Sequence, residues 1–319
     1  MAKLTMKKYQ ETKTVVELYE KFLLEREAIG ISEKALKTYR QKFQSVLRFY
    51  DFNIPIDEVS QDDITTLILN MKNKCRLDGK ETKIKDVTIS SYLAALKAFF
   101  NWCKEKEYCY ITVPNYKFET EPKEVYTHDE IKKLMKKPNL KKCSFCEYRN
   151  WVIICFLLNS GCRSATLRNV LIKDLDFDSD MILFRHMKAR NVQYVPMGKE
   201  MKHILLEYLD IREGKPDDYL FPNQHNQQLG ENALKLAIED YNHNRGVAKT
   251  SVHLFRHYYA KTYIQNGGDC FRLQKILGHK KIEMTMKYAN LYGVDTKRGF
   301  EEFSPLAVLS AEDKRIKMR

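Results

Sequence analysis

A polar stretch with two prolines, residues 113–125, interrupts the helical pattern of the chain and constrains its fold more than any other feature. Proline lacks a backbone N–H donor and breaks helices, so the stretch is typical of a connection between domains. Amphipathic patterns lie on both sides of it, and 319 residues are enough for two domains. We therefore expect a first domain at 1–112, a linker at 113–125 and a second domain at 126–319.

The first domain is predicted to contain four amphipathic helices. Gly30 ends the first helical pattern, Ser32 precedes the second, and Ser60 with Asp63 resembles a capping box before the third. Residues 75–86 are polar, contain a glycine and are expected to form the loop before the fourth helix. Because each helix carries one apolar face, the pattern predicts a small helical bundle.

The second domain is predicted to be mainly α-helical with a small β-sheet or hairpin. Thr127 and Glu130 form a capping box that restarts the helical pattern, and a nearly apolar helix then ends at Gly161. Two short β-type runs, 181–184 and 192–195, flank a polar stretch and predict the hairpin. Further helices are predicted at 199–209, 232–242, 252–265, 270–277 and 282–291.

The chain is strongly basic, with 55 Lys and Arg against 42 Asp and Glu and a formal net charge of +13. This excess favours a polyanionic partner such as nucleic acid, although a generic basic protein fits the charge about equally well. No apolar run is long enough to span a bilayer, and the N-terminus lacks an apolar signal core. We therefore expect a cytoplasmic protein, associated with the nucleoid in a prokaryote, and no membrane partner.

The eight cysteines fit a reducing compartment better than a disulfide framework. Cys143 and Cys146 form a CxxC pair, but a structural zinc site needs about four ligands and no second pair follows nearby. Ordinary thiols, and no metal site, are expected.

A set of cationic and nucleophilic residues in the second domain is the candidate for chemistry. His253 and Arg256 are three residues apart on a predicted helix and therefore face the same way. Arginine binds phosphate oxygens in a bidentate manner, and histidine exchanges a proton near neutral pH. An HxxR pair also occurs by chance on protein surfaces, and the chain has 19 tyrosines, so no member is informative alone. The set is Arg163, Lys188, His253, Arg256, His279 and Tyr288.

The order and spacing of these residues resemble the tyrosine recombinase (phage integrase) family. The similarity consists of Ser160-Gly161-Cys162-Arg163 after an apolar helix, Lys188 in a hairpin, His253-x-x-Arg256, Leu277-Gly278-His279, and Tyr288. It covers about residues 127–292, and the N-terminal bundle resembles the core-binding domain of that family. The resemblance implies a site-specific recombinase that cleaves and rejoins double-stranded DNA without a metal or cofactor.

The resemblance also implies a role for each residue. Arg163 and Arg256 would hold the scissile phosphate, and His279 would hydrogen-bond it. Tyr288 would attack phosphorus and form a 3′-phosphotyrosine, with His253 serving in its proton transfer and Lys188 protonating the leaving 5′-oxygen. This division agrees with the chemistry, because a phenol with a pKa of about 10 must lose its proton as it attacks.

Two residues depart from the family pattern. Many members carry an acidic residue three positions after the first arginine, where this chain has Thr166, so we expect a different support for Arg163. Cys162 replaces a larger apolar residue and is expected to serve in packing.

DNA contacts and assembly are predicted less specifically. Four basic residues lie close together on the second predicted helix, where phosphate contact and simple solvation are equally compatible with the pattern: Lys34, Lys37, Arg40 and Lys42.

The resemblance implies a homo-oligomer, from dimer to tetramer, that assembles on specific recombination sites through the C-terminal segment. An apolar cluster there either docks on a neighbouring protomer or folds back on its own domain: Phe303, Leu306, Ala307, Val308 and Leu309.

Two other functions remain alternatives at this level. A type IB topoisomerase-like nicking-closing enzyme would share most of the site. A non-enzymatic DNA-binding regulator would use residues 270–291 as a helix-turn-helix and leave Arg163, Lys188 and His253 unexplained. Among recombinases, integration or excision of a mobile element is the expected reaction.

Overall fold

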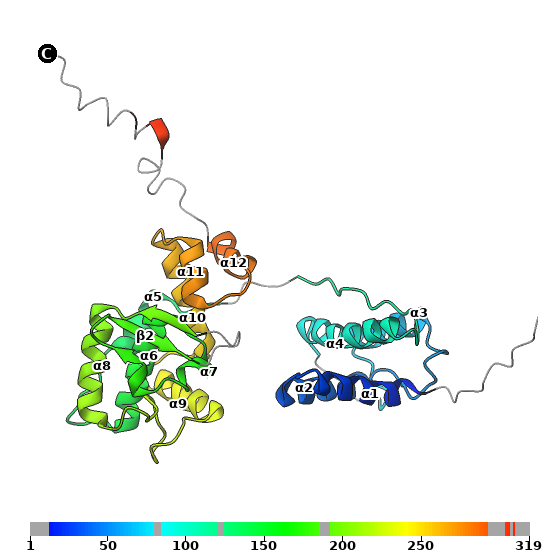
Figure 1. Cartoon of the computed structure of the whole chain (residues 1–319), viewed down its shortest axis with the longest axis horizontal. Coiled ribbons are helices and arrows are strands. Elements are labelled where there is room, and N and C mark those ends of the chain that lie inside the picture. Colours follow the sequence, from blue (N-terminus) through cyan, green and yellow to red (C-terminus); the bar gives the residue numbers. More distant parts are fainter. Residues whose placement is uncertain are drawn as a thin grey trace, which may run out of the picture. The chain divides into compact units, whose positions relative to one another are not determined.

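The computed structural model describes residues 13–79, 84–119, 124–185, 192–292, 304–306 and 309. The chain forms two compact units, Met1–Glu121 and Pro122–Arg319, each with its own helices (Figure 1). The division between the units falls inside the stretch 113–125.

The first unit is a bundle of helices, as the apolar periodicity predicts. Its helices are α1 (Val15–Ala28), α2 (Glu33–Val46), α3 (Gln61–Lys72) and α4 (Asp86–Glu105). The long helix α4 packs against the other three. Aromatic rings fill the centre, where Tyr19 stacks on Phe43 with 3.8 Å between ring centroids and also contacts Phe99. Val113, at the start of the predicted linker, is buried in the same core.

The second unit is mainly helical around a buried helix. Its helices are α5 (His128–Met135), α6 (Phe145–Ser160), α7 (Ser164–Leu167), the 3-10 helix η1 (Ile172–Asp174), α8 (Lys199–Arg212), α9 (Glu231–His243), α10 (Val252–Gln265), α11 (Cys270–Leu277) and α12 (Glu283–Tyr292). Helix α6 is buried along most of its length and packs against α5, α8, α9 and α10. This confirms the buried helix that the apolar run around Trp151 predicts.

The predicted hairpin is part of a three-stranded antiparallel sheet with the order β1-β2-β3. The strands are β1 (Leu175–Asp176), β2 (Met181–Phe184) and β3 (Gln193–Pro196), and β2 pairs with β3 from Met181↔Pro196 to Phe184↔Gln193. Strand β1 is absent from the prediction because two residues are too short to show an alternating pattern.

Two glycines with left-handed backbone place the ends of the helices that matter most for the site. Gly161, at φ 57°, ends α6, and Gly278, at φ 62°, ends α11. A β-carbon on Gly161 would lie 2.7 Å from the Tyr259 ring and 2.9 Å from Leu277, so the close approach of the backbone to these side chains also requires glycine there.

Among the helices within the described ranges, none has both the length and the apolar character needed to cross a membrane.

Candidate active site

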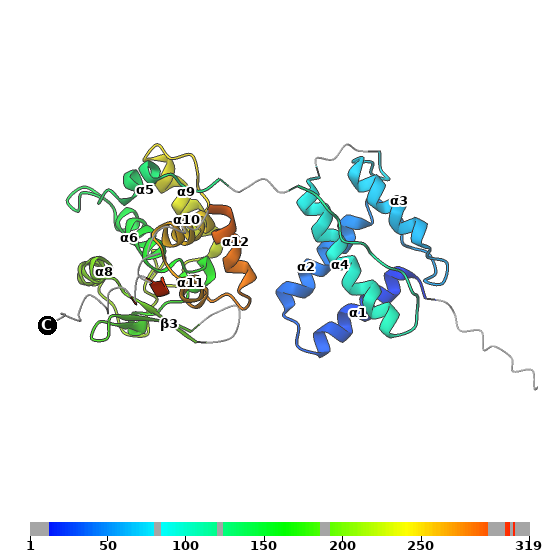
Figure 2. The same cartoon turned by 90° about the horizontal axis from the view of Figure 1, so that it is seen from above.

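Helices α10, α11 and α12 meet beside the C-terminal end of α6 and bring most of the predicted residues together (Figure 2). His253 and Arg256 lie on α10, and Tyr288 lies on α12. His279 follows Gly278, the residue that ends α11. Arg163 follows the end of α6 directly. The site is therefore assembled from segments that are far apart in the chain, with 114 residues between Arg163 and Leu277.

Arg256 is buried and is fixed by backbone carbonyls. Its Nη1 donates to the Gly161 carbonyl oxygen at 2.9 Å, and its Nη2 donates to the Leu277 carbonyl oxygen at 2.9 Å. Nη2 also lies 2.7 Å from Nε2 of His279. Burial and the charge of Arg163 lower the pKa of Arg256 to about 10, so the guanidinium is still protonated at neutral pH.

Arg163 points at the same helix end as Arg256. Its Nη1 and Nη2 donate to the carbonyl oxygens of Leu277 and Gly278, each at 3.4 Å. Burial lowers the pKa of Arg163. Within the described ranges, neither Arg163 nor Arg256 forms an ion pair with a carboxylate, which leaves two converging cations ready for an external anion.

The carbonyls at the end of α11 therefore support Arg163. In the family pattern described above, many members carry an acidic residue for this purpose. Thr166 itself is buried in α7, with 3% of its surface exposed. Cys162 is also buried and packs in the core of the second unit, and burial raises the pKa of its thiol to about 11. Cys162 thus stays a neutral thiol at physiological pH.

His279 is held in one tautomer by its two neighbours. Arginine has only donors, so Nε2 must accept from Arg256, and Nδ1 then carries the proton that is donated to Thr285 Oγ1 at 2.8 Å. Burial and the charges of Arg256 and Arg163 lower the pKa of His279 to about 4. The ring is therefore neutral at pH 7. Thr285, which is fully buried, is not foreseen by the motif.

Tyr288 is nearly buried, with 9% of its surface exposed, and its hydroxyl lies 3.0 Å from Nδ1 of His257. The Tyr288 ring is parallel to the His279 ring, with an interplanar angle of 2° and 6.5 Å between centroids. His253 is exposed and meets His257 edge to face at 4.7 Å. The sequence prediction misses His257, although its position four residues after His253 places both on one face of α10.

Lys188, the predicted general acid, lies outside the described residues. The strand that follows it is fixed near the arginine site, because Gln193 Nε2 donates to the Ile276 carbonyl oxygen of α11 at 2.8 Å. Strand β3 is thus anchored to α11, the helix whose last carbonyls accept from both arginines.

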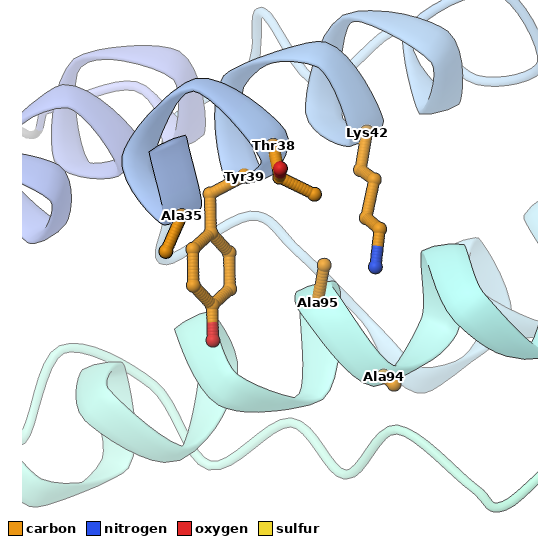
Figure 3. Close-up of a pocket in the computed structure, with 6 residues that line it drawn as sticks. All are labelled: Ala35, Thr38, Tyr39, Lys42, Ala94 and Ala95. Carbon is orange, nitrogen blue, oxygen red and sulfur yellow. The ribbon is translucent and has the colours of Figure 1, made fainter. Parts of the chain in front are cut away.

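The four basic residues predicted for DNA contact lie on α2 in the first unit. Lys34 and Lys37 are exposed, and Arg40 pairs with Glu20 at 3.3 Å. Lys42 lines a recess of about 290 Å³ between α2 and α4, where its side chain extends toward Ala94 and Ala95 (Figure 3).

A second recess between the end of α2 and the start of α4 is also basic. It has a volume of about 400 Å³ and is lined in part by Arg48, Arg76 and Lys85. Arg76 forms an ion pair with Asp78 at 2.5 Å, whereas Arg48 and Lys85 are exposed. Sequence reasoning misses these three, since they come from loops and a helix start that only the packing of α2 on α4 brings together.

The cysteines and potential metal ligands form no further centre in the part of the chain that the structure describes. No group of three or more His, Cys, Asp or Glu side chains is arranged to hold a metal ion there. Cys143 and Cys146 are free thiols, as are the other six cysteines.

Comparison with known proteins relates both units to characterised families. The family described as "Phage integrase family" matches residues 124–293, more than half of the chain, and "Phage integrase, N-terminal SAM-like domain" matches residues 18–109. Tyrosine recombinase XerD of Oceanobacillus iheyensis is 24% identical over 87% of this chain and 94% of the relative. Tyrosine recombinase XerA of Saccharolobus solfataricus is 29% identical over 86% of this chain and 88% of the relative.

Solved structures share the fold. The Tn1549 transposon integrase in complex with transposon right end DNA superposes with a TM-score of 0.71 at 21% identity, covering 94% of this chain and 99% of that one. A lambda integrase tetramer bound to a Holliday junction gives a TM-score of 0.69 at 16% identity, covering 88% of this chain and 78% of that one.

Proposed function

The chain is a site-specific tyrosine recombinase of the phage integrase family, and from this premise we propose that it cuts and rejoins DNA through a 3′-phosphotyrosine at Tyr288. The observation that carries the proposal is the convergence of Arg163, Arg256 and Tyr288 at one point of the second unit. Two guanidinium groups and a partly buried phenol together match the needs of phosphoryl transfer.

The arginines bind the scissile phosphate. Arginine has five N–H donors, and the hydrogen bonds of Arg256 to Gly161, Leu277 and His279 use three of them. The carbonyls orient the guanidinium, and the remaining donors are available for phosphate oxygens. Because the two cations are already in place, they stabilise the negative charge of the transition state without reorganisation.

His279 positions Arg256 before DNA is bound. Its neutral ring accepts from Arg256, whereas a hydrogen bond to the phosphate requires a proton on Nε2. A bound phosphodiester anion raises the pKa of a neighbouring histidine, so DNA binding itself favours that proton. We assign His279 these two states, one in the free protein and one on DNA.

The attacking Tyr288 oxygen and the leaving 5′-oxygen lie on opposite sides of the phosphorus atom. The Tyr288 oxygen forms a bond to phosphorus as the bond from phosphorus to the 5′-oxygen breaks, and Lys188 supplies the proton that the leaving oxygen takes up. The phosphotyrosine keeps the energy of the phosphodiester, so attack by a 5′-hydroxyl rejoins the strand without a nucleotide cofactor. The covalent step is therefore reversible, as strand exchange requires.

The biological reaction we propose is integration or excision of a mobile element. This is supported by the fold shared with a transposon integrase bound to transposon end DNA and by the 29% identity, over 60% of this chain, to a probable integrase/recombinase of Acholeplasma phage L2. We further propose assembly of two to four copies on DNA, in line with the dimer and tetramer of lambda integrase on DNA. Of the C-terminal apolar cluster, Leu306 and Leu309 are described and exposed, and Phe303, Ala307 and Val308 lie outside the described residues.

A covalent adduct tests the proposal directly. We expect the wild-type protein to become covalently linked to the 3′ end of a nicked suicide DNA substrate, because loss of the short cleaved strand prevents rejoining. Tyr288→Phe lacks the nucleophilic oxygen and should bind the same DNA without forming an adduct, as read on a denaturing gel. An adduct of undiminished yield in Tyr288→Phe would refute the assignment.

Recombination is distinguished from nicking and closing by the products. With two cognate sites on separate DNA molecules, a recombinase yields junctions that contain one strand segment from each molecule. Relaxation of supercoils without such junctions would instead identify a nicking-closing enzyme.

A further inference from the structure

We propose that His257 is a further catalytic residue, the acceptor of the Tyr288 proton during attack on DNA; the proposal rests on the function proposed above. The hydroxyl of Tyr288 lies 3.0 Å from His257 Nδ1, which is hydrogen-bonding distance. In the tautomer with its proton on Nε2, which we assign to His257, Nδ1 accepts the phenol proton. Neither the motif nor the family resemblance singles out this histidine.

The contact is built by the packing of α10 against α12 (Figure 2). His257 follows Arg256 directly, so one turn of α10 supplies both a phosphate-binding cation and the partner of the nucleophile. Tyr288 is only 9% exposed, which limits direct proton loss to bulk water. An acceptor inside the site is therefore needed more than for an exposed tyrosine.

His279, whose ring is parallel to that of Tyr288, is not available as the acceptor. In the free protein Nε2 of His279 accepts from Arg256 and Nδ1 donates to Thr285. In the state proposed for it on DNA, both nitrogens carry a proton, so neither can accept another. The rings of His279 and Tyr288 lie parallel with 6.5 Å between centroids, a stacked arrangement that does not direct the hydroxyl at a ring nitrogen.

His253, to which the family resemblance assigns proton transfer, lies beside His257 on α10. Its exposed ring contacts the ring of His257 edge to face at 4.7 Å. The two imidazoles therefore share one face of α10, and the Tyr288 hydroxyl contacts His257.

The proposed step balances in protons and electron pairs. The phenol O–H bond breaks, its electron pair forms the bond to phosphorus, and the proton moves to Nδ1 of His257 to give an imidazolium. The electron pair of the broken P–O bond stays on the 5′-oxygen, which takes its proton from Lys188. Rejoining returns the proton from His257 to the released phenolate.

The test measures single-turnover cleavage of a suicide substrate by His257→Ala and His257→Asn. The amide of asparagine accepts a hydrogen bond near the position of Nδ1 but is not a base, so both variants should cleave roughly 100-fold or more slowly, the usual range for loss of a general base. His203→Ala, an exposed histidine on α8, is the matched control and should cleave at the wild-type rate. Thermal unfolding and DNA binding of His257→Asn verify that the site is still formed.

Chemical rescue separates proton acceptance from packing. A fluorinated tyrosine introduced at position 288 has a lower phenol pKa, needs less help in losing its proton, and should recover most of the rate lost in His257→Ala. A 5′-bridging phosphorothiolate, whose leaving group needs no proton, should rescue Lys188→Ala but not His257→Ala.

Several results overturn the proposal: wild-type cleavage by His257→Ala or by His257→Asn, or no gain from the fluorinated tyrosine. Each of these leaves Tyr288 as the nucleophile. Failure of the wild-type protein to form any adduct would instead overturn the proposed function itself, so the two failures are distinguishable.

Discussion

At the scale of single residues, the site places buried cations against backbone oxygens and not against carboxylates. Arg256 is 3% exposed, yet its hydrogen bonds go to the carbonyls of Gly161 and Leu277 and to a neutral His279. A buried charge with no opposite charge is unfavourable for stability. In the function we propose, the scissile phosphate supplies the missing negative charge when DNA is bound.

The depressed pKa of His279 makes folding stability depend on pH. Its pKa is about 4 in the folded protein against an ordinary value of 6.5, so between these values the unfolded chain binds more protons than the folded one. The contribution to the free energy of unfolding is therefore fully present above about pH 6.5 and is lost as pH falls toward 4.

This dependence is measured by urea unfolding at intervals from above the ordinary pKa of 6.5 down toward the folded pKa of about 4. His279→Gln keeps an oxygen that accepts from Arg256 but does not titrate, so its stability should change less over the range than that of the wild type. Parallel pH curves for the two proteins would contradict the assignment of a neutral, buried His279.

At the scale of elements, the ends of α6 and α11 organise the active site. Each ends at a glycine with left-handed backbone, and the carbonyls at these two ends bind Arg256. The helix C-terminus carries partial negative charge, which favours a cation there. Local sequence thus sets the helix ends, and the ends in turn set the direction of the guanidinium groups.

Gly161→Ala tests the role of the α6 end. The new β-carbon would lie 2.7 Å from the Tyr259 ring and would hold alanine at a positive φ, so we expect unfolding to become easier by about 2 kcal/mol or more. DNA cleavage should also fall, because displacement of the Gly161 carbonyl releases Arg256.

Gly246→Ala is the matched control. Gly246 also has a positive φ, +67°, but a β-carbon there meets no atom within 4 Å. Gly246→Ala should lose about 1 kcal/mol of the free energy of unfolding, the cost of a positive φ alone, and should cleave DNA normally. Equal losses of stability in both variants, measured by denaturant unfolding, would mean that close packing at Gly161 has no role.

At the scale of the whole molecule, the chain forms two units with separate cores, to which we assign different tasks. The second unit contains the described catalytic candidates, and the first presents basic residues around α2 and α4. Such a division lets phosphate contacts by one unit hold DNA while the other performs chemistry. Contacts to phosphates contribute affinity that falls with salt, and they carry little sequence information.

The basic recesses predict a graded effect on DNA affinity. Replacing Arg48 and Lys85 with alanine should weaken binding uniformly across DNA sequences and reduce the slope of log affinity against log salt by about 1 for each phosphate that is no longer neutralised. Arg40→Ala should change the slope less, because Arg40 already pairs with Glu20. Fluorescence anisotropy at several salt concentrations measures both, and an Arg40 effect larger than that of the double variant would contradict this ranking.

The sequence by itself determined the elements and the kind of chemistry. Apolar periodicity and capping residues such as Ser60 and Thr127 are local, so they predict the helical bundle, the buried helix α6 and the hairpin. The ordered motif from Arg163 to Tyr288 likewise predicted the family, because residue types at fixed spacing are visible without coordinates.

Only the tertiary structure decided how these residues act on one another. Whether Tyr288 contacts His253, His257 or His279 depends on how α12 packs on α10, and no spacing along the chain encodes that choice. The support of Arg163 by the carbonyls at the end of α11 has the same origin. Periodicity fixes which face of a helix is apolar, whereas side-chain partners from segments more than 30 residues apart are fixed by packing, as the 31-residue separation of His257 and Tyr288 illustrates.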